Sequence, residues 1–111
     1  MEFEDVRRAA LQFRDDRSWT QFHNPKDLAI SVSLEAAELL EAFQWSGSDT
    51  SATRIEDKVK EELADVLIYC IYLADACNID IADIIAEKLA RNAEKYPADK
   101  ARGNSRKYTE L

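Results

Sequence analysis

Four acidic residues with helical spacing are the part of this sequence best suited to chemistry. Glu35 and Glu38 lie three positions apart, as do Glu62 and Asp65, and 23 residues separate the two pairs. Residues three apart on a helix project from the same face. Both pairs have apolar neighbours, so buried carboxylates there would need a cation or a hydrogen-bonding partner. Two antiparallel helices would bring the four acids to one point, where one or two divalent metal ions would neutralise them.

The donor atoms indicate which metal would bind. Carboxylate oxygens favour hard cations, with Mg²⁺ first and Mn²⁺ second. Di-iron bundles usually add a Glu-x-x-His pair on each of two helices, whereas the single histidine, His23, lies outside the acidic pairs. Zinc would need histidine or cysteine beside the acids. On spacing alone, a solvated acidic face is the alternative to a metal site.

The elements that must position these acids are helices. With only two Gly and two Pro in 111 residues, the chain has little material for hairpin turns, which disfavours an all-β fold. Steps of three and four between apolar residues predict helices, with Asn24 and Asp80 as N-caps and Gly47 as a left-handed C-cap. We expect helices over residues 3–16, 25–45, 54–77 and 81–95.

The third of these helices is apolar nearly all round from Asp65 onward and should be the most buried element. The apolar surface of this helix exceeds what a monomeric four-helix core requires, which indicates a subunit interface. We expect a single domain over residues 1–111. Within it, residues 97–111 form a polar tail without periodicity that orders only against a ligand or a partner.

Charge excludes some classes of partner. The net charge is −7, and the excess acid lies in residues 1–96, which hold 20 acidic and 11 basic residues. Such a body repels a phosphate backbone, so we expect no nucleic-acid binding, and a metal cation must mediate any contact with phosphates. The sequence shows no leader peptide and no apolar run that could span a membrane. Free thiols at Cys70 and Cys77 fit the cytoplasm.

Several linked motifs resemble the MazG-like nucleoside triphosphate pyrophosphohydrolases. The first is the pattern Glu35-x-x-Glu38 followed by Glu62-x-x-Asp65. The segments that surround it resemble the dCTP pyrophosphatase branch over about residues 11–97. These segments are 13–25 (FRDDRSWTQFHNP), 40–45 (LEAFQW), 61–69 (EELADVLIY), 88–92 (KLARN) and 95–97 (KYP).

The resemblance implies an all-α, MazG-like helical bundle with four main helices per chain, completed by oligomerisation to a dimer or tetramer. It implies Mg²⁺-dependent hydrolysis of a nucleoside triphosphate to the monophosphate and pyrophosphate, with dCTP or a modified dNTP favoured. The first and last helices and the tail vary most within that family, which leaves the role of the tail open. Its metal-binding and catalytic residues would be Glu35, Glu38, Glu62 and Asp65.

The resemblance also implies a base pocket and phosphate contacts. Tyr69 follows Asp65 by four positions, which places it on the metal-facing side of the helix. The pocket would consist of Trp19, His23, Trp45 and Tyr69. Contacts to the triphosphate or sugar would come from Lys88, Arg91, Asn92 and Lys95. The alternative to this enzyme is an acidic helical interaction module whose carboxylates are structural. Base preference, metal count and the carboxylate that orients the water stay open.

Overall fold

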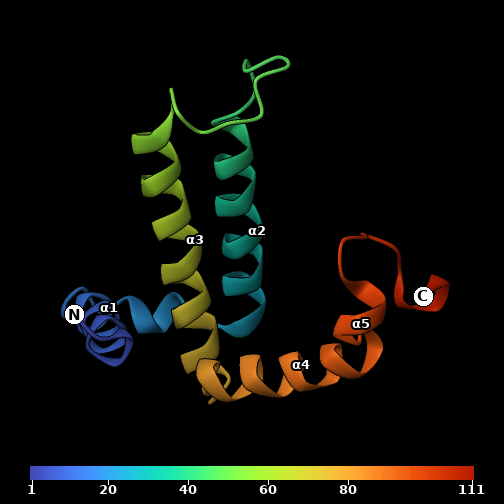
Figure 1. The fold of residues 1–111 in the computed structure, drawn as a ribbon. Coiled ribbons are helices and arrows are strands. Elements are labelled where there is room, and N and C mark those ends of the chain that lie inside the picture. The colour runs from blue at the N-terminus through green and yellow to red at the C-terminus, as the bar shows by residue number, and fades with distance from the viewer. The chain divides into compact units, whose positions relative to one another are not determined.

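The computed structural model describes all of residues 1–111 and contains helices and turns without a β-strand. The elements are α1 (Phe3–Asp16), η1 (Trp19–Phe22), α2 (Pro25–Glu41), α3 (Glu56–Ala76), α4 (Ile81–Lys95), α5 (Ala98–Ala101) and η2 (Tyr108–Glu110) (Figure 1). They form two compact units, Met1–Asn78 and Ile79–Leu111. The all-α prediction is confirmed, and the single domain over 1–111 stays a prediction.

An antiparallel hairpin of α2 and α3 is the main feature of the first unit (Figure 1). The Asn24 side chain accepts a hydrogen bond from the Asp27 amide at 2.9 Å, so the predicted N-cap is confirmed. The helix ends at Glu41 and not near Trp45, because the next amides bond three residues back. The Ala42 amide, for example, lies 3.2 Å from the Leu39 carbonyl oxygen.

The connection between α2 and α3 is longer than predicted. Gly47 has a φ of +60° and adopts the left-handed conformation, but it lies beyond the end of α2 and turns the loop instead of capping the helix. The next helix starts at Glu56, two residues after the predicted position, and ends at Ala76. These shifts amount to about one helical turn at most and leave both acidic pairs inside their helices.

The core lies where α1 packs against the C-terminal half of α3. Leu28, Ile71, Tyr72 and Ala74 are its buried apolar residues, three of them from α3, so the prediction that this helix is the most buried is confirmed. The Tyr72 hydroxyl donates a hydrogen bond to the Ala10 carbonyl at 3.0 Å. This bond joins α1 to α3 at the level of the core.

Apolar side chains also remain exposed on the α2–α3 hairpin. They keep between 44% and 72% of their surface open, and they are Ile30, Leu34, Leu40, Leu63 and Leu67. Exposed apolar surface of this kind is typical of protein–protein contacts. None of the helices combines the length and the hydropathy that a membrane crossing requires.

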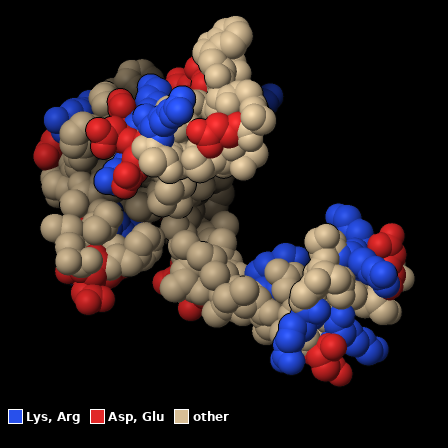
Figure 2. All heavy atoms as spheres, turned by 45° about the horizontal axis from the view of Figure 1, so that its top comes forward, with Lys and Arg blue, Asp and Glu red and all other residues tan.

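The second unit starts at the predicted N-cap of α4, where the Asp80 side chain accepts from the Asp83 amide at 2.9 Å. Residues 97–111, predicted to be a polar tail that orders only against a ligand or a partner, include the short helices α5 and η2. The ring of Tyr108 packs edge-on against Tyr96 at 6.0 Å, and the Lys95 ammonium lies 5.0 Å from its centroid. Lys and Arg side chains are numerous on this unit (Figure 2).

Candidate metal centre and aromatic cleft

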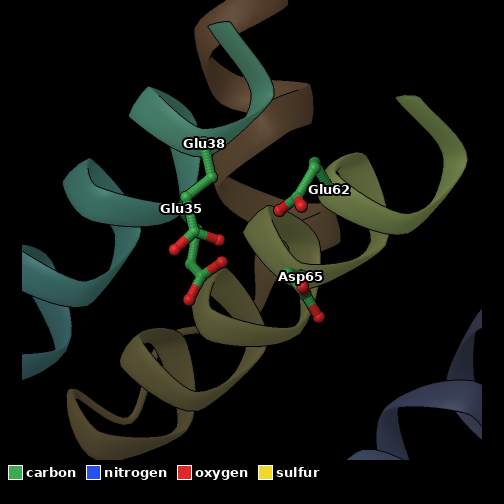
Figure 3. Close-up of side chains that lie close together, drawn as sticks. All are labelled: Glu35, Glu38, Glu62 and Asp65. Atoms are coloured by element: carbon green, nitrogen blue, oxygen red, sulfur yellow. The ribbon is translucent and has the colours of Figure 1, made fainter. Parts of the chain in front are cut away.

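The four predicted carboxylates meet between α2 and α3. Glu35 and Glu38 project from α2 toward Glu62 and Asp65 on α3 (Figure 3). One carboxylate oxygen from each residue lies within 4.8 Å of those of the other three. The helical spacing inside each pair and the antiparallel hairpin together produce this convergence.

Burial makes the cluster costly without a positive charge. Glu62 is only 4% exposed. Its Oε2 atom and the Oε2 atom of Glu35 are buried without a hydrogen-bond partner. Polar atoms in this state are rare in native proteins, and a bound ion is one arrangement that would satisfy them. The one basic group that reaches the cluster is Lys58, whose Nζ lies 2.6 Å from Glu62 Oε1.

Mutual repulsion changes the protonation of the cluster. Hydrogen bonding with Glu35 and with Glu62, together with the negative charge of both, raises the pKa of Glu38 to about 7. The ion pair with Lys58 lowers the pKa of Glu62. Near neutral pH, a proton on Glu38 and the Lys58 ammonium thus share the role of counter-charge.

These residues fit a divalent metal. All four donors are carboxylate oxygens, which suit Mg²⁺ and Mn²⁺, and Glu35 and Glu62 each carry a buried oxygen without a hydrogen-bond partner. A metal ion bound among them would replace both the proton and the ammonium. The solvated acidic face that spacing alone left open does not describe Glu35 or Glu62, since each buries a carboxylate oxygen.

A cleft of about 490 Å³ opens next to the carboxylates, between α1, η1 and α3. Asp65 belongs both to the acidic cluster and to the wall of this cleft. Phe13, Trp19, Tyr69 and Tyr72 supply aromatic surface, and smaller apolar residues complete the lining with Val6, Ala9, Ala10 and Ile68. The cleft is therefore mostly apolar, with an acid at one edge.

Five aromatic rings form a connected group around this cleft. Phe13 packs edge-on against Trp19 at 5.7 Å, and Trp19 lies 6.5 Å from His23. The His23 ring lies 5.2 Å from Tyr72, which in turn packs edge-on against Tyr69 at 5.9 Å. Three of the four predicted pocket residues are thereby brought together.

His23 carries a ring nitrogen without a hydrogen-bond partner, the buried Nδ1 atom. Burial, and to a smaller extent the positive charge of Arg14, lowers its pKa. The imidazole is therefore neutral at physiological pH, with one ring nitrogen free to accept or donate.

Trp45 lies apart from the other predicted pocket residues. It is 89% exposed and lines a different depression, of about 310 Å³, formed with the loop that joins α2 to α3. This loop is at the end of the hairpin away from α1 (Figure 1). The part of Trp45 in a base pocket stays a prediction.

The predicted phosphate contacts all lie on α4 in the second unit. Lys88 and Asn92 are four residues apart, as are Arg91 and Lys95, so each pair shares a helix face. Their approach to a nucleotide stays a prediction.

Sequence reasoning missed three residues of this region. Lys58 is four positions before Glu62, and this spacing is the signal that could have revealed the ion pair. Tyr72, three positions after Tyr69, shares its helix face and could have been found in the same way. Arg14 is buried and lies 2.8 Å from Asp75, a pairing across 61 positions for which the sequence offers no signal.

A family model described as the MazG-like family matches residues 30–111. The chain belongs to the MazG-like family. It is 42% identical to dCTP pyrophosphatase 1 of Homo sapiens and 39% identical to that of Mus musculus, in both cases over 97% of its own length. It spans 66% of the length of these relatives.

A solved structure supports the same assignment. The crystal structure of a pyrophosphatase from Archaeoglobus fulgidus DSM 4304 is 41% identical to the chain and superposes with a TM-score of 0.78. The match covers 85% of this chain and 91% of the other. The predicted family and helical fold are confirmed.

Proposed function

We propose that this protein is a Mg²⁺-dependent nucleoside triphosphate pyrophosphohydrolase that removes unwanted dNTPs from the nucleotide pool. Its preferred substrates are dCTP and modified or non-canonical dNTPs. Water is consumed, the bond between the α and β phosphates breaks, and the products are the nucleoside monophosphate and pyrophosphate. Mn²⁺ is the expected substitute for Mg²⁺.

The observation that carries this proposal is that Asp65 links the carboxylate cluster to the aromatic cleft. The same side chain belongs to the carboxylate cluster and to the aromatic cleft. A nucleotide with its base in the cleft would thus place its phosphates near the cluster. An acidic interaction module gives no reason for buried, unpartnered carboxylate oxygens beside an aromatic cleft.

The cleft suits a nucleobase in size and chemistry. Stacking on aromatic rings contributes about 1–3 kcal/mol per base in proteins that bind single strands. Tyr69 and Trp19 line the cleft and offer such faces. The His23 ring, whose centroid lies 6.5 Å from that of Trp19, would supply a polar edge that reads the base. The names of the mammalian relatives favour deoxycytidine nucleotides as substrates.

The carboxylates would hold the metal and take part in proton transfer. Glu35, Glu38, Glu62 and Asp65 are the proposed ligands, and one of them accepts the proton of the attacking water. A bound Mg²⁺ would offset the negative charge of the triphosphate and polarise it. The apolar walls of the cleft keep bulk water away from the base. Lys88, Arg91, Asn92 and Lys95 would contact the phosphates or sugar.

We also propose that the active form is a homo-oligomer. Leu34, Leu40 and Leu67 are each more than half exposed on the hairpin, and a second copy would cover such side chains. The free thiols of Cys70 and Cys77 fit a cytoplasmic enzyme.

A product assay tests the proposal. The protein with Mg²⁺ is incubated with each standard dNTP and with 5-modified dCTP, and pyrophosphate is resolved from orthophosphate. We expect pyrophosphate and the monophosphate, with deoxycytidine substrates turned over fastest. Orthophosphate would place the cleavage elsewhere, and no turnover with either Mg²⁺ or Mn²⁺ would favour the interaction module.

Matched variants locate the activity. Glu38→Gln and Asp65→Asn should lose turnover while keeping the helical circular dichroism. Glu41→Gln removes an exposed acid from the same region outside the cluster and should keep turnover. Retained turnover in the first two variants would contradict the metal site.

A further inference from the structure

We propose that Lys58 is a built-in counter-ion of the metal centre, which occupies Glu62 in the metal-free protein and is displaced when a divalent cation binds. The proposal rests on the metal site of the proposed function. It concerns a residue outside the four carboxylates and assigns it a role in setting metal affinity.

The position of the Lys58 ammonium carries the argument. Its Nζ lies 2.6 Å from Glu62 Oε1, while the other oxygen of the same carboxylate, Oε2, is buried and unpartnered. One oxygen of Glu62 therefore has a cation beside it, and the other is left without a hydrogen-bond partner. No other basic residue is paired with any of the four carboxylates.

The two ends of the pair differ in exposure. The Glu62 side chain is 5% exposed and is fixed by its helix, whereas the Lys58 side chain is 52% exposed and ends a flexible chain. An ammonium in this position can turn out into water at small cost, because about half of the Lys58 side chain is already exposed. Glu62 cannot follow it, so the carboxylate stays in place for another cation.

Charge explains why the ammonium should leave. Close to a bound divalent ion, a positive side chain is repelled, and a carboxylate shared with the metal offers it less attraction. Binding therefore includes the cost of breaking the Lys58–Glu62 pair. This cost lowers the apparent metal affinity. In the metal-free protein, the same ion pair supplies a positive charge to the acidic cluster.

Lys60 provides a matched control. It lies on the same helix turn and forms a pair of the same i, i+4 spacing, with Nζ at 3.2 Å from Glu56 Oε1. Both members of that pair are exposed, at 68% and 66%. Lys58→Met and Lys60→Met remove the same charge from α3, but only the first vacates a carboxylate of the cluster.

The test measures Mn²⁺ binding to the full chain by isothermal titration calorimetry without nucleotide. We expect Lys58→Met to bind Mn²⁺ about two- to fivefold more tightly than the wild type, and Lys60→Met to stay close to the wild type. Equal Mn²⁺ affinity of the two variants would overturn the role of Lys58 but would leave the proposed metal site standing. Absence of Mn²⁺ binding by the wild type would overturn the metal site and this inference together.

A second measurement follows the ammonium itself. In side-chain NMR of ¹⁵N-lysine protein, adding Mg²⁺ should shift the Lys58 ammonium resonance toward that of a solvated lysine and leave Lys60 unchanged. A Lys58 resonance that stays unchanged at saturating Mg²⁺ would show that the ion pair survives metal binding and would contradict displacement.

Discussion

The proton on Glu38 should make metal binding depend strongly on pH. Contact with Glu35 and Glu62 raises the pKa of Glu38 to about 7 in the metal-free protein. A carboxylate must lose its proton before it can coordinate a cation. Below this pKa the metal has to displace the proton, and above it the ligand is already ionised, so apparent affinity rises with pH.

The pKa sets the size of the effect. With a pKa of about 7, about a tenth of the Glu38 side chains are ionised at about pH 6 and about nine tenths at about pH 8. The apparent association constant for Mn²⁺ should therefore increase about tenfold over this interval and level off above it. At the lower pH, binding should also release close to one proton per protein.

Calorimetry in two buffers of different ionisation enthalpy measures both quantities. Glu38→Gln should bind Mn²⁺ more weakly and lose most of the pH dependence, while Glu41→Gln should behave like the wild type. An affinity for Mn²⁺ that is the same at both pH values, with no proton released, would refute the reasoning. It would mean either that Glu38 is ionised in the apo protein or that it is not a ligand.

Three further predictions concern the scaffold around the site. Burial lowers the pKa of His23 below its usual 6.5, so the unfolded chain takes up the proton first as pH falls. The free energy of unfolding should therefore decrease as pH drops below about 6.5. In urea melts, His23→Asn should lack this part of the pH dependence. Arg14→Met should lower the unfolding free energy by about 1–3 kcal/mol, because it removes the hydrogen bonds of a nearly buried guanidinium, while its exposed partner Asp75 can rehydrate. In the same melts, Arg8→Met, which removes an exposed guanidinium, should change the unfolding free energy by less than about 0.5 kcal/mol. Leu28→Ala should cost about 2–5 kcal/mol, because Leu28 is only 1% exposed and its truncation leaves a cavity; a loss below about 1 kcal/mol would show that the core at α2 is looser than the structure has it.

The buried Arg14 links stability to function. Its guanidinium joins Asp15 on α1 to Asp75 on α3 and lies 5.9 Å from the Tyr72 ring. The first helix supplies one wall of the cleft through Phe13. Loosening α1 should therefore affect nucleotide binding more than metal binding, since none of the four proposed metal ligands lies on that helix.

Local signals in the sequence predicted the helices well. The N-caps Asn24 and Asp80 both accept the expected hydrogen bonds, because a short polar side chain before a helix can reach the free amides of its first turn. Helix ends were less predictable. After Glu41 the backbone amides bond three residues back, and the apolar spacing that predicted a helix to about Trp45 does not report this change.

The tail, residues 97–111, shows a contact that local sequence signals did not predict. Its polar composition and lack of periodicity indicated order only against a ligand or a partner, yet Tyr108 packs against Tyr96 and Lys95 of the same chain. Contacts between residues separated by a turn cannot be derived from periodicity, which reports only on neighbours along one helix.

The sequence by itself determined the four carboxylates, their pairing and the hard cation that they suit, because three-residue spacing on a helix fixes which side chains share a face. Only the tertiary structure decided what surrounds them. It placed Asp65 in an aromatic cleft, paired Lys58 with Glu62, and put Trp45 at the other end of the hairpin. The physical reason is that burial, pKa and cleft shape arise from how helices pack, and packing joins residues whose separation in the chain carries no information.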